Sequence, residues 1–223
     1  MTRWATFDCY GTLIDWDGGI RSCFASLWPQ ADADLLLERY HEIEPRVQQG
    51  SSQAYREVLA QGLRLLADEE DLPLAATDEA ALADSLPSWR PFPEVPGALA
   101  DLRGRGFNLV ILSNTDPDLL AASLERIGVP VEGAITAAEA GSYKPAHGHW
   151  ERFFELFQAD REHHVHVGAS VFHDLEPAAE LGLRAVWINR LRDASDAPRA
   201  AELKDLSRLP EVADSLVPAD PVP

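Results

Sequence analysis

The chain has 223 residues, of which 46% are hydrophobic and 25% are charged, as in a folded globular protein and unlike a collagen-like, coiled-coil or disordered chain. Its 19 basic and 37 acidic side chains give a net charge of −18, which disfavours nucleic acids and anionic membrane surfaces as partners. A small anionic substrate is compatible with this charge only if the pocket supplies positive groups of its own.

The cysteines and the start of the chain bear on its compartment. Cys9 and Cys23 are the two cysteines, and neither belongs to a CxxC pair, so we expect no zinc site. The first residues, MTRWATFDCYGT, do not have the pattern of a signal peptide. No stretch has the roughly 18 consecutive apolar residues that a membrane span needs. We therefore expect a reduced, cytoplasmic protein.

The first part of the chain changes from a strand to a helical pattern. Residues 4–8 are predicted to form a short buried strand that ends on a charge and is followed by a Gly-Thr turn. In residues 17–89, apolar side chains recur every three or four positions, which predicts about four helices, with Asp32 as the N-cap of the second. The residues expected to separate these helices are Pro29, Pro45, Gly50 and Pro73.

After a boundary at Pro91, Pro93 and Pro96, short apolar segments alternate with helical ones. The expected strands are 107–113, 133–136, 164–168 and 184–188. The expected helices are 118–127, 150–157 and 175–181. This alternation predicts a parallel sheet, and therefore an α/β core that a helical insert interrupts after the first strand. The segment from Pro210 is acidic and contains prolines, and we expect its end to be frayed.

Polar residues follow the predicted strands at the edge where an open parallel sheet binds its ligands. They are Asp8, the Ser113–Asn114 pair, Lys144 and Asp174. Taken singly, each has an ordinary structural explanation as a turn residue, a helix cap or a solvated lysine. Their succession at the ends of consecutive core strands favours a functional interpretation.

This set of residues resembles the motifs of the haloacid dehalogenase (HAD) superfamily. The segments DCYGT, LSNT, YKP and VGASVFHD match its four motifs in order, and the helical insert resembles the cap domain of the first subclass. The resemblance implies a Rossmann-like core formed by residues 1–15 and 91–216, with a helical cap at 16–90. Residues 217–223 would form a frayed tail.

The resemblance also implies a hydrolase with a nucleophilic carboxylate. Asp8 would form a covalent aspartyl intermediate, which water would hydrolyse by attack on the aspartyl carbon. Lys144 and Thr12 would position Asp8, and Asp174 would complete the catalytic set. The presence of these residues argues against the hypothesis of a binding protein without catalytic activity.

Two chemistries of the superfamily fit these motifs to different degrees. Its phosphatases have a second Asp two residues after the nucleophile, but this chain has Tyr10, whose phenol suits acid–base catalysis at neutral pH poorly. They also have an acidic pair in the fourth motif, but here Ala169 replaces the first acid. The DxYGT form is that of the 2-haloacid dehalogenases, which need no metal because halide leaves without a proton.

We therefore expect a metal-independent 2-haloacid dehalogenase that acts on a small anionic 2-halo acid. The alternative is a Mg²⁺-dependent phosphatase, with the cation held by Asp8, the Tyr10 backbone and Asp174. The family's use of a cap arginine for halide points to Arg39, whose simpler explanation is an exposed ion pair with Glu42. A homodimer is common among the dehalogenases and is compatible with this chain. The expected substrate-binding residues are Tyr10, Arg39, Ser113, Asn114, Trp150 and His173.

The fourth motif departs from the dehalogenases where they hold the hydrolytic water. Ala169 and Val171 stand in place of a Ser and an Asn, and His173 replaces a Trp. His173 beside Asp174 is then a candidate base, because an ordinary imidazole titrates at a pKa of about 6.5. Otherwise the water is held differently, or the substrate is not a halo acid.

Overall fold

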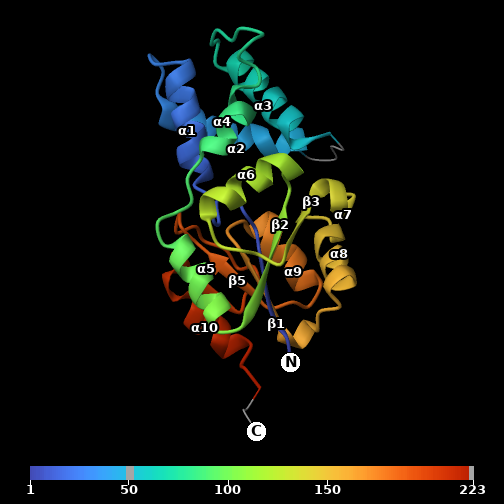
Figure 1. Ribbon diagram of the computed structural model, residues 1–223. Coiled ribbons are helices and arrows are strands. Elements are labelled where there is room, and N and C mark those ends of the chain that lie inside the picture. The colour runs from blue at the N-terminus through green and yellow to red at the C-terminus, as the bar shows by residue number, and fades with distance from the viewer. Residues whose placement is uncertain (49–52, 221–223) are drawn as a thin grey trace.

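The core of the protein is a parallel β-sheet in the computed structural model, which describes residues 1–48 and 53–220 (Figure 1). Six strands lie in the order β3-β2-β1-β4-β5-β6, and every adjacent pair is parallel. They are β1 Arg3–Phe7, β2 Phe107–Ser113, β3 Gly133–Thr136, β4 His164–Gly168, β5 Ala185–Ile188 and β6 Ala201–Leu203. The winding direction reverses between β1 and β4, as in doubly wound nucleotide-binding folds, and the expected α/β fold is confirmed.

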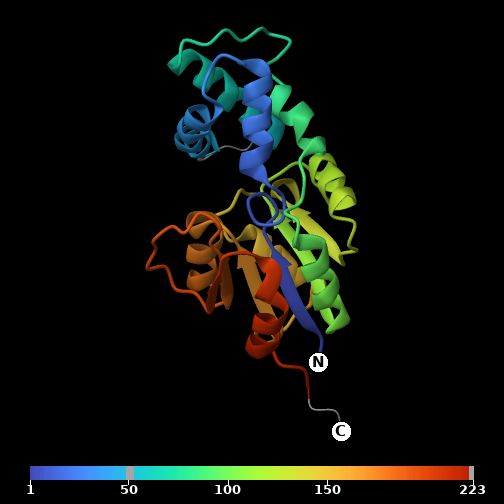
Figure 2. The same ribbon diagram turned by 90° about the vertical axis from the view of Figure 1, so that its left-hand side faces the viewer.

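Helices cover both faces of the sheet because successive side chains of each strand point to opposite faces (Figures 1 and 2). In β2, Leu109 and Ile111 join one apolar cluster, whereas Val110 and Leu112 join the other. The first cluster includes α5 (Val95–Gly104), α6 (Pro117–Ile127) and α10 (Leu209–Leu216). The second includes α8 (Gly148–Phe157) and α9 (Glu176–Glu180). The short α7 (Ala137–Ala140) follows β3.

The insert between β1 and β2 forms a helical cap above the carboxyl ends of the strands (Figure 1). It contains α1 (Trp16–Leu27), α2 (Ala33–Gln48), α3 (Tyr55–Glu69) and α4 (Ala81–Ser85). The predicted N-cap of α2 is confirmed, because Asp32 Oδ1 accepts hydrogen bonds from the backbone N–H of Asp34 and Leu35. None of the helices in the described ranges is long and apolar enough to cross a membrane.

The predicted helix break at Pro45 is wrong, because Pro45 lies inside α2. A proline within a helix removes one hydrogen bond, here to the carbonyl of His41, and crowds that carbonyl. The neighbouring side chains of Ile43, Glu44 and Gln48 are buried, and this packing holds the helix through the proline. The other predicted breaker in this region, Gly50, lies outside the described residues.

The C-terminal part of the chain is more ordered than its sequence indicates. The elements α5, β6 and α10 are not among those that the sequence predicts. Val217, where the predicted frayed tail begins, is buried. Arg3 on β1 donates hydrogen bonds to the Val217 carbonyl at 3.0 Å and to Asp214 Oδ1 at 2.7 Å. Residues 221–223 of that tail lie outside the described ranges, and the domain boundaries at 15/16 and 90/91 stay predictions.

Candidate active site

A buried ammonium group joins the carboxylates that follow β1 and β4. Lys144 Nζ lies 2.8 Å from Asp8 Oδ1 and 2.7 Å from Asp174 Oδ1. Lys144 is 2% exposed and Asp174 is fully buried, so these charges are shielded from water. The topology explains the meeting, because the strands that precede Asp8 and Asp174 are neighbours in the sheet.

The environment affects the three charged groups unequally. Burial would lower the pKa of Lys144, but Asp174 and Asp8 outweigh it and raise that pKa above its ordinary value. Burial would raise the pKa of Asp174, but Lys144 and His166 outweigh it and lower that pKa. At Asp8, burial prevails over the opposing effect of Lys144 and raises the pKa. Asp8 is therefore the more basic carboxylate of the pair.

Thr12 holds the second oxygen of Asp8 through a tight turn. Its hydroxyl donates to Asp8 Oδ2 at 2.8 Å and accepts the backbone N–H of Ala169 at 2.9 Å. The turn passes through Gly11 at a φ of 84°, which favours glycine. Cys9 is fully buried, in keeping with a packing role.

Asn114 fixes the loop that carries Lys144. Its Oδ1 accepts the Lys144 backbone N–H at 2.6 Å, and its Nδ2 donates to the Lys144 carbonyl at 3.0 Å. Nδ2 also lies 3.3 Å from Gln48 Oε1 of the cap. The amide is thus engaged with the chain itself, although Asn114 and the preceding Ser113 both line the cavity described next.

A cavity of about 520 Å³ opens between the cap and the carboxyl ends of the strands. The core contributes Asp8, Lys144 and Asp174 to its lining, and the cap contributes aromatic and polar side chains. The cap residues that line it include Trp16, Arg21, His41, Glu44, Gln48 and Tyr55. Burial raises the pKa of Glu44 to about 7. The cavity therefore combines an apolar wall with charged groups at its base.

Tyr10 and His173 also line the cavity. The Tyr10 hydroxyl lies 2.9 Å from Ser123 Oγ, and burial raises its pKa further above the neutral range. The His173 backbone N–H donates to Ser170 Oγ, which also lies 3.1 Å from His173 Nδ1. Burial lowers the pKa of His173 to about 4, so its ring is neutral at pH 7.

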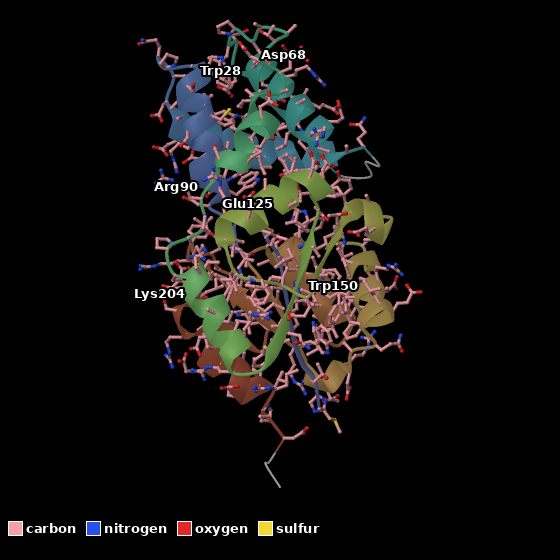
Figure 3. All side chains as sticks on the ribbon, in the orientation of Figure 1. Trp28, Asp68, Arg90, Glu125, Trp150 and Lys204 are labelled. Carbon is pink, nitrogen blue, oxygen red and sulfur yellow. The ribbon has the colours of Figure 1, made fainter. Side chains whose placement is uncertain are left out.

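Two residues expected at the substrate lie elsewhere. Arg39 is on the outer surface of α2, where its guanidinium binds carboxylates of α2 and of the end of α3 and is absent from the cavity lining. Those carboxylates belong to Glu42, Glu69 and Glu70. Trp150 lies on α8 (Figure 3) and is fully buried against the sheet. Its ring packs against the His166 ring, with 5.1 Å between the ring centroids.

Two cavity residues at the end of β5 are not among those predicted from the sequence. Asn189 and Arg190 follow that strand and line the cavity. Arg190 Nη2 donates to the Thr12 carbonyl at 2.8 Å and to Glu94 Oε1 at 2.7 Å, and the guanidinium lies over the Phe92 ring. The strand-end rule that selected Asp8 and Asp174 could have found both residues.

The metal site of the phosphatase alternative has few ligands here. The alternative relies on Asp8, the Tyr10 backbone and Asp174, but Lys144 Nζ already lies between the two carboxylates. Within residues 1–48 and 53–220, no group of three or more His, Cys, Asp or Glu side chains is arranged to hold a metal ion.

Comparisons with known proteins point to one family. A family model described as haloacid dehalogenase-like hydrolase matches residues 2–182. Haloacetate dehalogenase H-2 of Moraxella sp. (strain B) is 31% identical over 196 residues, which cover 85% of this chain and 87% of that protein. The (S)-2-haloacid dehalogenase of Pseudomonas sp. (strain YL) is 27% identical over 201 residues, covering 82% and 81%. A solved L-2-haloacid dehalogenase has a TM-score of 0.86 at 24% identity, covering 96% and 99%.

Replacing Lys144 by Met tests the electrostatics of this cluster without any substrate. The variant leaves two buried carboxylates without their cation, and we expect a loss of about 3–5 kcal/mol of unfolding free energy at pH 8. Their folded-state pKa values would rise above the unfolded value of about 4, so the folded form would bind more protons than the unfolded form. The variant's stability should therefore fall as the pH rises from 4.5 to 8.

The measurement is urea unfolding at several pH values, with Lys204→Met as the matched control. Lys204 is an exposed lysine, so its loss should change neither the midpoint nor its pH dependence appreciably. A Lys144→Met midpoint with the pH dependence of the unmodified protein would contradict the assigned charge cluster.

Proposed function

Because the chain belongs to the family of haloacid dehalogenase-like hydrolases, we propose that it hydrolyses the carbon–halogen bond of small 2-halo carboxylic acids without a metal ion. The observation that carries the proposal is the arrangement around Asp8, whose two oxygens are held by Lys144 and Thr12. The position two residues after Asp8 holds Tyr10, a weak acid engaged with Ser123. This arrangement suits a leaving group that needs no proton.

In the first step, a carboxylate oxygen of Asp8 attacks carbon 2 of the substrate, and halide leaves with the bonding electrons. An ester between Asp8 and carbon 2 results. The raised basicity of Asp8 supports this role, because a more basic carboxylate is the better nucleophile. Lys144 holds one Asp8 oxygen and so orients the carboxylate for the attack.

In the second step, water attacks the carbonyl carbon of the aspartyl ester. The bond between that carbon and the ester oxygen breaks, and the product leaves as a 2-hydroxy acid. We propose that His173, whose neutral ring lines the cavity, is the base that activates this water. With Nδ1–H donating to Ser170, Nε2 takes the water proton and returns it to the departing alkoxide. This assignment supplies the group that Ala169 and Val171 cannot.

The cavity supports substrates larger than haloacetate. Its volume of about 520 Å³ lies within the range of drug-sized ligand pockets, and Trp16 and Tyr55 give it an apolar wall. We therefore expect turnover of 2-halo acids with longer side chains.

A two-arm assay on the purified protein tests the activity. One arm offers 2-chloropropionate enantiomers, haloacetates and longer 2-halo acids in EDTA and measures halide. The other offers an aryl phosphate with Mg²⁺ and measures phosphate. We expect halide release that survives EDTA and is lost in Asp8→Asn, which keeps the shape of the side chain but not its charge. Phosphate release that requires Mg²⁺, without halide release, would contradict the proposal.

A pair of cap arginines offers a matched test of substrate binding. Arg21 lines the cavity, whereas Arg39 lies outside it. The Arg21 Nε also donates a hydrogen bond to the exposed Asp34 Oδ1 at 2.5 Å. We propose that Arg21 attracts the anionic substrate, so Arg21→Ala should raise KM for the halo acid about tenfold. Arg39→Ala should leave KM unchanged. Steady-state halide release measures KM in both variants. A KM raised in Arg39→Ala and unchanged in Arg21→Ala would contradict the role of Arg21 and favour Arg39 instead.

A further inference from the structure

Two histidines and a threonine that the proposed reaction does not use lie behind Asp174. Thr6 on β1 is opposite His166 on β4, and His164 lies two residues earlier on the same face of β4. All three are fully buried. Thr6 Oγ1 is 2.8 Å from His164 Nε2 and 2.9 Å from His166 Nδ1, so one hydroxyl joins both rings.

The chain of contacts continues to the charged cluster. His166 Nε2 lies 3.4 Å from Asp174 Oδ1, a long hydrogen bond, and the same oxygen accepts the bond from Lys144. Trp150 packs edge-on against the His166 ring at 5.1 Å and holds its plane. His166 therefore links the two interior polar residues, Thr6 and His164, to the carboxylate.

The protons in this chain have one favourable arrangement. An ionised Asp174 only accepts, so His166 donates from Nε2 and, as a neutral ring, accepts at Nδ1 from the Thr6 hydroxyl. Thr6 then accepts from His164 Nε2, which leaves His164 Nδ1 as a lone pair. That atom has no hydrogen-bond partner in the described part of the chain, and burial lowers the pKa of His164 well below its usual range. The opposite arrangement would bury an unpaired N–H.

We propose that His166, oriented by Thr6 and His164, is a positioning residue that acts on the nucleophile through Asp174 and Lys144. Asp174 Oδ2 accepts the Ser170 backbone N–H at 3.1 Å, so His166 and Lys144 together hold the other oxygen. Without the His166 donor, Asp174 would be protonated more readily and would hold Lys144 less firmly. Lys144 would then stabilise Asp8 in the attacking geometry less well. The catalytic part of this inference rests on the proposed function.

The pH dependence follows from the groups around Asp174. Asp8 has the higher pKa of the two carboxyl groups, so its ionisation sets the acidic limb of the kcat/KM profile. When Lys144 holds Asp8 less firmly, it favours the ionised carboxylate less and the pKa of Asp8 rises, so the limb should move to higher pH. The titratable groups that face Asp174 are Asp8, Lys144, His149, His166 and His173.

The kinetic test compares His166→Phe with its conservative partner. Phe fills the ring's volume without nitrogens, and we expect kcat to fall about tenfold, as for a lost hydrogen bond to a charged group, with KM nearly unchanged. The acidic limb should shift upward by up to about one pH unit. His166→Gln keeps a donor and should restore most of kcat and the limb. If His166→Phe does not fold, Thr6→Val serves as the second variant. It should show a smaller fall in kcat and a smaller shift of the acidic limb than those expected for His166→Phe.

Val165→Ala is the matched control for simple destabilisation. Val165 is buried on the same strand but points to the opposite face, so this variant should lower the melting temperature and leave the acidic limb in place. The inference is overturned if His166→Phe behaves like Val165→Ala, or if His166→Gln rescues nothing.

A spectroscopic arm separates this inference from the proposed activity. Without substrate, ring ¹⁵N spectra should show His164 and His166 as neutral Nε2–H tautomers, and the Lys144 ammonium signal should move in His166→Phe but not in Val165→Ala. These results with no halo acid turned over would contradict the proposed function and support the positioning chain. A charged His166 ring, or an unmoved Lys144 signal, would overturn the positioning chain even in an active dehalogenase.

Discussion

The contact on which the site depends is a lysine ammonium buried between two carboxylates. Two acids so close could not both stay ionised away from water without a cation between them. Lys144 meets that requirement. Its position depends on the order of the sheet, which places β1 beside β4, and on the segment between α7 and α8, which brings its ammonium group to both carboxylates. Asn114 and Thr12 then fix the loop and the second Asp8 oxygen. The cap closes the space above this cluster.

The protein's overall charge and its site have opposite requirements. A net charge of −18 repels small anions at long range, but at short range the response depends on the groups at the cavity base. Lys144 is already neutralised by two carboxylates, so the cap's cations have more to contribute to the capture of an anionic substrate. Capture of the substrate should therefore depend mainly on Arg21 and on the exclusion of water by the cap.

The strands of the core, and the meeting of polar residues at their carboxyl ends, could be predicted from the sequence because both depend on recognisable strands. A buried parallel strand is a recognisable apolar run, and its carboxyl end fixes where the next polar side chain lies. Asp8, Lys144 and Asp174 could be placed together on that basis. The cap is different, because a spacing from the nucleophile does not fix which side of a helix a residue occupies. Tyr40 and Glu44 of α2 are buried and His41 and Glu44 line the cavity, which leaves Arg39 on the outer surface.

Other elements could not be predicted because their stability comes from tertiary contacts. α10 begins beside Pro210 and contains acidic residues, but Leu209 and Ala213 pack into the core and Arg3 binds the segment from β1. Trp150 had the right place in the sequence for a substrate wall, yet α8 turns it toward the sheet. There it holds His166, a residue with no recognisable motif of its own.

The central claim is that Asp8 becomes an ester and is regenerated by water. A single turnover in ¹⁸O water, with enzyme in excess over a 2-halo acid, tests it directly. The bond-breaking pattern predicts that the solvent oxygen enters the Asp8 carboxyl group and that the first 2-hydroxy acid formed carries none, as mass spectrometry of the peptide and the product would show. Label in the product with an unlabelled Asp8 would mean that water attacks carbon 2 directly, and would contradict the account.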